Sequence, residues 1–165
     1  MNLDLYLTEF KSAASRIDKT KFDPRIQFFV GYFLDSAVFK AYKPEWSNQP
    51  QDPVTAISRI FFSVWISKES IETNRLYYNI HALKLRQLAG YKITSRDFAE
   101  RFRHTFKPQA KSWPNIDTNY GPQTLMQGWK QLDNQTLQKD VATLVHHFSA
   151  VSPIIDSTLE FYRVK

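Results

Sequence analysis

Apolar residues recur at intervals of three and four along most of this chain, the spacing that gathers side chains on one face of an α-helix. The first such set runs from Leu3 to Ile17. A second set follows the step Asp23-Pro24, where Asp can cap a helix and Pro fits its first turn. Since this second set, over 26–41, is apolar on most sides, we expect it to be a central helix.

The longest helical pattern covers 54–88. We expect a break within it near 67–70, because Ser67 or Ser70 could cap a new helix. Gly90 suits the position after a helix end, where a left-handed backbone is needed.

Four shorter helices are expected in the remainder of the chain. Thr94 with Asp97 forms a variant of the capping box, and further helices are expected after Pro122, after Asp133 and after the step Ser152-Pro153. No segment alternates convincingly with a period of two, and neither Asn-Gly nor Asp-Gly occurs. The pattern therefore predicts a single all-α domain over 1–165, a bundle of about seven helices.

The predicted core consists of the most regularly spaced apolar side chains in these segments. Its members are Phe29, Val30, Phe33, Phe61, Val64, Ile80, Leu83, Phe102, Leu144 and Phe148.

Two Pro-rich stretches, about 43–53 and 107–121, interrupt the helical pattern and are expected to be irregular loops. They carry three aromatic residues, Trp46, Trp113 and Tyr120. Loops of this length are uncommon in compact domains unless they are functional or mobile. These side chains are expected either to pin the loops to the bundle, the commoner case, or to line a pocket or partner surface.

Composition excludes several kinds of chemistry. The chain has 165 residues, 42% of them apolar, which suits one domain with a substantial core. It has no Cys, which removes disulfides, thiol nucleophiles and thiolate metal sites. With only four Gly and no Gly-rich motif, phosphate-binding loops are not expected.

The four His give no recognisable metal or catalytic motif. No His pair has the spacing of a zinc helix, and Glu100 with His104 is explained by an ordinary contact on a helix surface. Asp140 and His147 would share a helix face, but an inter-helix polar contact explains them better than a catalytic dyad. We therefore expect no catalytic residue, metal or cofactor; nothing in the sequence argues for an enzyme, although the sequence does not exclude one.

The N-terminus has no basic region followed by a long apolar run, and no apolar stretch reaches the roughly 18 residues of a membrane span. The expected location is the cytoplasm.

Charge is distributed unevenly. The net charge is +6, and residues 1–52 and 108–165 each balance to zero, so the whole excess lies in 53–107. Within 75–107 the pattern predicts a helix, a turn and a second helix. The basic residues proposed there as a polyanion-binding surface are Arg75, Lys84, Arg86, Lys92, Arg96, Arg103 and Lys107.

Two functional hypotheses follow. The first is a small binding or adaptor protein that contacts nucleic acid or an acidic protein through the basic helix pair at 75–107. The alternative is a helical bundle that binds or converts a small molecule in a pocket near the 107–121 loop.

Overall fold

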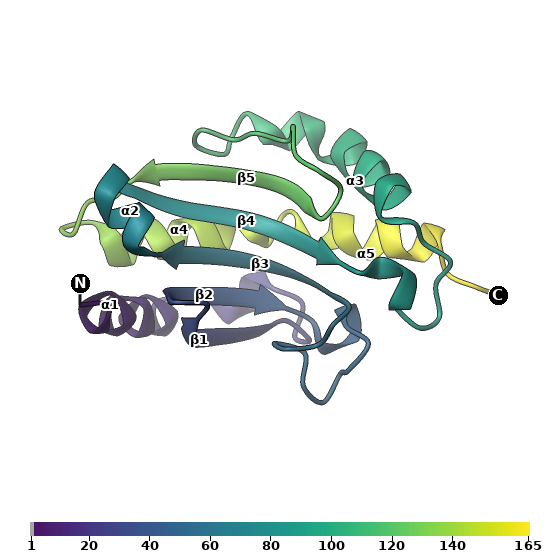
Figure 1. The fold of residues 1–165 in the computed structure, drawn as a ribbon, viewed down its shortest axis with the longest axis horizontal. Coiled ribbons are helices and arrows are strands. Elements are labelled where there is room, and N and C mark those ends of the chain that lie inside the picture. The colour runs from purple at the N-terminus through teal and green to yellow at the C-terminus, as the bar shows by residue number, and fades with distance from the viewer. Residues whose placement is uncertain (1) are drawn as a thin grey trace.

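The computed structural model describes residues 2–165 and has an antiparallel sheet of five strands at its centre (Figure 1). The strands lie side by side in chain order, so each pairs with the next. They are β1 (Gln27–Phe33), β2 (Ser36–Tyr42), β3 (Arg59–Ile66), β4 (Arg75–Leu83) and β5 (Thr124–Gln131). The expectation of an all-α bundle is therefore wrong: the fold is mixed, with 40% helix and 26% strand.

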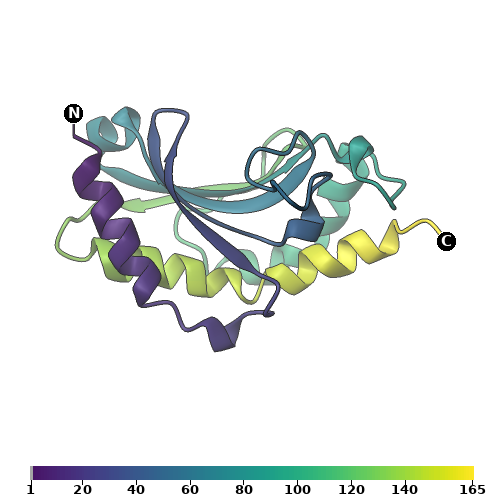
Figure 2. The same ribbon diagram turned by 90° about the horizontal axis from the view of Figure 1, so that it is seen from below.

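Helices cover one face of this sheet. The helices α1 (Asp4–Ser15), α4 (Leu137–Phe148) and α5 (Ser152–Phe161) lie beneath it, as Figure 2 shows. The longest helix, α3 (Ser95–Ala110), lies alongside β5 and contacts α5, and the short α2 (Lys68–Thr73) connects β3 to β4. The opposite sheet face, called the open face below, has no long helix on it (Figure 2).

The prediction of helices over β2 and β3 was wrong because these two strands are buried on both faces. Every residue of β2 is buried, including Lys40, and most of β3 is too. In a continuous apolar run, apolar residues necessarily also occur three and four positions apart, as they do in a helix. Such a run lacks the alternation of apolar and polar residues that identifies a strand with one solvent-exposed face.

The hairpin between β1 and β2 uses turn residues that sequence rules do not favour. Phe33 pairs with Ser36, which leaves Leu34 and Asp35 as a two-residue loop. Both have positive φ, 49° and 61°, as the tight hairpin turn requires. Because Leu is poorly suited to a left-handed backbone, nothing in the sequence indicated a turn at this position.

The segment after Pro122, expected to be helical, is strand β5, and Gly128 within it accommodates a close contact. A Cβ atom built on Gly128 would lie 2.3 Å from Oη of Tyr78. That hydroxyl donates a hydrogen bond of 2.6 Å to the Pro114 carbonyl and fixes the loop after α3 against the sheet. The expected loop over 107–121 starts later than predicted, because α3 continues through Pro108 to Ala110.

The sequence predicted the helices more accurately than the strands. The helices α1, α4 and α5 lie within the expected segments. A capping box formed by Ser67 and Ser70 begins α2, and the Thr94 side chain accepts a hydrogen bond from the Asp97 amide at the start of α3. These predictions are confirmed because caps and amphipathic faces are local features.

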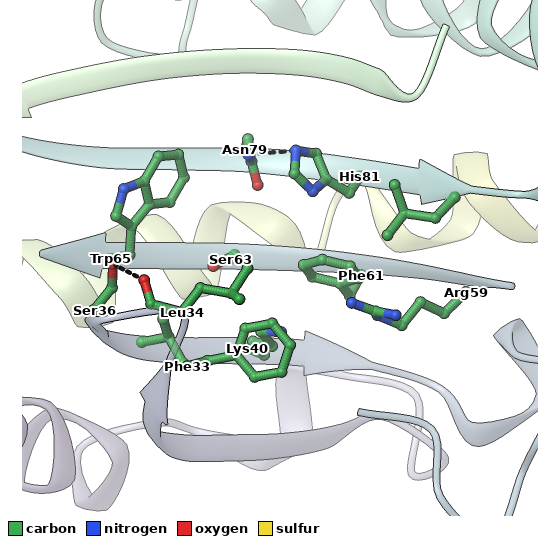
Figure 3. Close-up of a pocket in the computed structure, with 12 residues that line it drawn as sticks. Phe33, Leu34, Ser36, Lys40, Arg59, Phe61, Ser63, Trp65, Asn79 and His81 are labelled. Atoms are coloured by element: carbon green, nitrogen blue, oxygen red, sulfur yellow. Dashed lines mark hydrogen bonds between the residues drawn. The ribbon is translucent and has the colours of Figure 1, made fainter. Parts of the chain in front are cut away.

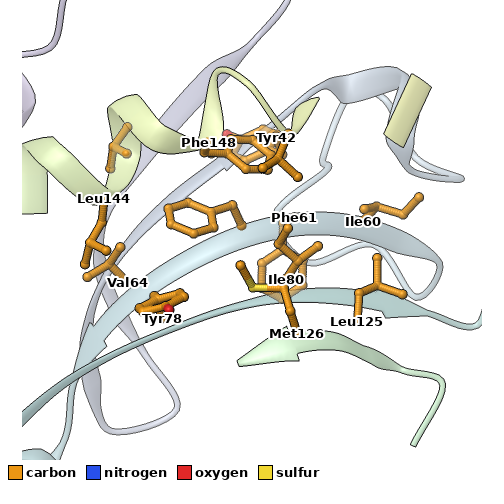
Figure 4. Packing of buried hydrophobic residues seen from close by; sticks show 14 of the residues in the cluster. Tyr42, Ile60, Phe61, Val64, Tyr78, Ile80, Leu125, Met126, Leu144 and Phe148 are labelled. Carbon is orange, nitrogen blue, oxygen red and sulfur yellow. The ribbon is translucent and has the colours of Figure 1, made fainter. Parts of the chain in front are cut away.

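The core lies between the sheet and the helices (Figure 4). Phe62 of β3 stacks on Phe148 of α4, with 4.8 Å between ring centroids. Six predicted core residues are buried, whereas four are only half-buried because they lie on the edge strand β1 or at the end of β4. The buried six are Phe61, Val64, Ile80, Phe102, Leu144 and Phe148, and the other four are Phe29, Val30, Phe33 and Leu83.

A polar cluster around the buried Lys43 joins distant parts of the chain. The Lys43 ammonium is fully buried and contacts carboxylate oxygens of Asp23 at 2.8 Å and Asp156 at 2.6 Å. The Trp46 indole donates a hydrogen bond of 2.9 Å to Asp156. Although burial opposes the charged form, the hydrogen bonds to Asp156 and Asp23 raise the pKa of Lys43. This lysine is therefore held as a cation.

Candidate functional site

The open face of the sheet contains a cavity of about 300 Å³ over β2, β3 and β4, with the β1–β2 hairpin along one side (Figure 3). We call it the Lys40 pocket. It is lined by Phe33, Leu34, Ser36, Val38, Lys40, Arg59, Phe61, Ser63, Trp65, Asn79, His81 and Leu83.

Strand register explains how polar and aromatic side chains come together there. Lys40 is paired with Ser63, and Ser63 with Asn79, so these three form a polar row across the sheet. The neighbouring rows on the same face are aromatic, with Trp65 beside Tyr77 on one side and Phe61 beside His81 on the other. A ligand on this face would therefore meet polar groups between apolar walls.

Lys40 is the most unusual residue of the pocket. Its relative exposure is 3%, and its ammonium has no hydrogen-bond partner within the protein. The nitrogen lies 3.5 Å from the ring centroid of Phe33 and 4.4 Å from that of Phe61. Burial and the nearby Arg59 guanidinium lower the pKa of Lys40 to about 7.

Arg59 lies at the start of β3 and contacts the same two rings. Its guanidinium carbon is 5.1 Å from the centroid of Phe61. One terminal nitrogen donates to the Ala56 carbonyl, but Nε is buried without a partner. Arg59 therefore offers a free, charged donor beside Lys40.

His81 and Asn79 form the side of the pocket on β4. Their Nε2 and Nδ2 atoms are 3.0 Å apart (Figure 3). Burial and the positive charges of Lys40 and Arg59 lower the pKa of His81 to about 4, so its neutral ring accepts from the Asn79 amide. Oδ1 of Asn79 is buried and unpaired, and a register shift between β4 and β5 falls beside it, at Ile80 and His81. Such irregularities commonly re-aim side chains at functional sites.

No carboxylate balances these charges. None of the pocket-lining residues is Asp or Glu, and the five strands contain neither residue type at any position. Two basic side chains, Lys40 and Arg59, therefore share one apolar cavity without a counter-charge. Burying a charge in this way is costly unless something pairs with it.

The basic segment 75–107 has a different arrangement from the one expected. Its first part is strand β4 rather than a helix, so the predicted basic helix pair is wrong. Arg75 begins β4 and Lys84 follows its end, about 30 Å away at the usual rise of a strand. Lys84, Arg86, Lys92, Arg96 and Lys107 are exposed. Binding of a polyanion through them remains a prediction.

Two members of that set make internal contacts. The Arg75 guanidinium lies 3.9 Å from the ring centroid of Trp129. Arg103 donates hydrogen bonds to the carbonyls of Tyr120, Gly121, Thr124 and Leu125, so it holds the loop before β5 in place.

The predicted loop aromatics differ in environment. Trp46 and Trp113 are buried and pack on the core, whereas Tyr120 is 40% exposed. A second cavity of about 300 Å³ borders the loop after α3 and is lined in part by Trp113, Lys130, Asp140 and His147. Asp140 there pairs with Lys130 at 2.7 Å and accepts from Thr136, so the charges compensate each other within the protein.

Sequence reasoning did not identify the Lys40 pocket. One signal was available: Lys40 lies within the mostly apolar stretch 36–42 and Arg59 begins the stretch 59–66, and neither stretch contains an acidic residue. If these segments were helices, Lys40, Ser63 and Asn79 would lie on separate helices with no fixed relation to one another. The strand register instead places the three residues in one row across the sheet.

Within residues 2–165, no group of three or more His, Asp and Glu is placed to hold a metal ion. None of the helices over the same residues combines the length and apolar character needed to cross a bilayer. No protein-family model, curated protein or solved structure matches the chain.

Proposed function

We propose that this protein binds a small organic anion in the Lys40 pocket. The observation that carries the proposal is the buried, unpartnered ammonium of Lys40, beside the unpaired Nε of Arg59 and without an acid in the pocket lining. An anionic group of the ligand, a carboxylate or a phosphate, would supply the missing counter-charge to both side chains.

The walls of the pocket indicate what else the ligand carries. Phe33, Phe61 and Trp65 are apolar and aromatic, and the cavity volume is in the range of small-molecule sites. The ligand therefore has an apolar or aromatic body next to its anionic group, and Oδ1 of Asn79 can accept one hydrogen bond from it.

Thermal unfolding with benzoate, phenyl phosphate and the uncharged analogue benzyl alcohol tests the proposal. The anions are expected to raise the melting temperature, because a ligand that binds only the folded state stabilises it. Benzyl alcohol is expected to have a much smaller effect. Comparing benzoate with phenyl phosphate shows which anionic group the pocket prefers.

The variant Lys40→Met is expected to weaken anion binding about 10- to 100-fold, the usual value of a charge-assisted hydrogen bond. Lys84→Met, which removes an exposed lysine after β4, is the matched control and should bind normally. If neither anion stabilises the protein, or if both variants bind equally well, the proposal is wrong.

A further inference from the structure

Two buried lysines three residues apart have different surroundings. Lys43 is paired with two carboxylates, so its nitrogen has no free electron pair to offer. Lys40 has no hydrogen-bond partner and lines a cavity, where the Phe33 ring covers its nitrogen, so a ligand reaches the nitrogen by displacing that ring. An amine in this situation can act as a nucleophile as well as a cation.

We infer that the Lys40 pocket takes an oxo acid, a compound with a carboxylate and an aldehyde or ketone group, and that Nζ of Lys40 forms an imine with its carbonyl carbon. This inference rests on the proposed function and assigns separate tasks to the two basic side chains. Arg59 holds the carboxylate, which a guanidinium binds well, and Lys40 is left free to meet the carbonyl.

The surroundings of Lys40 favour the neutral amine that this reaction needs. The titratable or charged groups that face it are Arg59 from β3 and His81 from β4, while β1 contributes only the Phe33 ring near its nitrogen. The guanidinium is positive, His81 is neutral near pH 7, and no acid lines the pocket. With its pKa lowered to about 7, roughly half of Lys40 is unprotonated at neutral pH, against less than about one in a thousand for an ordinary lysine.

The reaction requires no further reagent. The amine nitrogen adds to the carbonyl carbon, the C=O π electrons move to oxygen, and one proton passes from nitrogen to that oxygen. The resulting carbinolamine loses its hydroxyl group together with the second nitrogen proton as one molecule of water, which leaves a C=N bond. Nothing is oxidised or reduced in these steps.

Trapping with 4-carboxybenzaldehyde and sodium cyanoborohydride at pH 7 tests the inference. The reductant converts the imine to a stable amine, so intact mass and peptide mapping locate the modification. We expect one adduct per chain, at Lys40, forming at least about tenfold faster than on exposed lysines such as Lys84, because the pocket both binds the aldehyde and holds the amine beside it. Lys43 should remain unmodified.

Lys40→Arg keeps a positive charge but cannot form an imine, so it should lose the adduct. Lys84→Arg should retain it, and circular dichroism checks that both variants are folded. Even adduct formation over all exposed lysines, or an undiminished adduct in Lys40→Arg, would overturn the inference.

A non-carbonyl analogue, 4-carboxybenzyl alcohol, separates this inference from the proposed function. If the alcohol binds and yet the aldehyde gives no adduct at Lys40, the pocket binds anions but the imine is wrong. If neither compound binds, both the anion pocket and the imine are wrong.

Discussion

Lys40 and Lys43 show how strongly the surroundings of one residue determine its effect on stability. Both are buried, but only Lys43 has counter-charges. An unpaired buried charge lowers stability, and a site that keeps one commonly uses it for binding or catalysis. In the ligand-free protein, Lys40 is therefore expected to reduce the free energy of unfolding.

The variant Lys40→Met should raise the free energy of unfolding by about 2 kcal/mol at pH 6.5. The folded-state pKa of about 7 lies below the ordinary value near 10.5, so the unfolded chain binds more protons between these values. Stability of the wild type therefore rises with pH over that interval, and the advantage of the variant shrinks toward pH 10. Urea unfolding at several pH values measures both effects. A destabilised variant at pH 6.5 would contradict this prediction.

His81 should make the protein sensitive to acid. Its folded-state pKa of about 4 lies below the ordinary 6.5, so the unfolded state takes up a proton first as the pH falls. The free energy of unfolding is expected to drop by up to about 2 kcal/mol between pH 6.5 and 4 through this group. The dependence of the free energy of unfolding on pH in this interval should be weaker in His81→Gln. The control His104→Gln, at an exposed position of α3, should leave that dependence unchanged. Equal slopes in all three proteins would refute the assignment.

At the scale of elements, the β1–β2 hairpin is held in register despite an unfavourable turn. Leu34 is 84% exposed, and both it and Asp35 adopt positive φ. The register is therefore fixed by the pairing of β2 with both neighbours, and Leu34 in the turn opposes it.

Replacing Leu34-Asp35 with Asn-Gly should raise the free energy of unfolding by about 1 kcal/mol, because these residues adopt the left-handed backbone more easily. Equilibrium unfolding in urea measures the change. The reverse control, Leu34→Val with its β-branched side chain, should lower stability. A loss of stability in the Asn-Gly variant would show that the loop is held by other contacts.

The helices could be predicted from local sequence signals, whereas the sheet and the Lys40 pocket depend on pairing between residues far apart in the sequence. Ser67 and Thr94 are N-cap residues that bond to amides only three positions later in the sequence, and α4 has one apolar face. The starts of α2 and α3 and the position of α4 could therefore be predicted. The strand β2, buried at all seven positions, gives no alternating pattern. The Lys40 pocket depends on the register of three strands, and segment-by-segment reading cannot supply that register.

At the scale of the whole molecule, the cluster of Lys43, Asp23, Asp156 and Trp46 connects the segment around β2 to α5. Removing one carboxylate leaves the buried Lys43 ammonium with less counter-charge. This lowers the free energy of unfolding more than removing the carboxylate and the ammonium together.

Asp156→Ala should therefore lower the free energy of unfolding by about 3 kcal/mol. Adding Lys43→Met should recover part of that loss, a coupling that a double-mutant cycle measures by thermal or urea unfolding. If the losses of the two single variants simply add in the double variant, the cluster does not act as a unit.

The helix α1 packs against α4, where the Glu9 carboxylate accepts a hydrogen bond of 3.0 Å from Gln138 and the Asp18 amide donates one of 2.9 Å to His146. The part of α1 that packs on α4 is therefore covered only after the five strands between them in the sequence have been made. Although α1 can cover β1 and β2 as soon as these strands are made, the rest of this apolar sheet face stays uncovered until α4 and α5 have been synthesised. The domain therefore cannot complete its folding before α4 and α5 have been made, and a nascent chain stalled before α4 is expected to bind chaperones strongly.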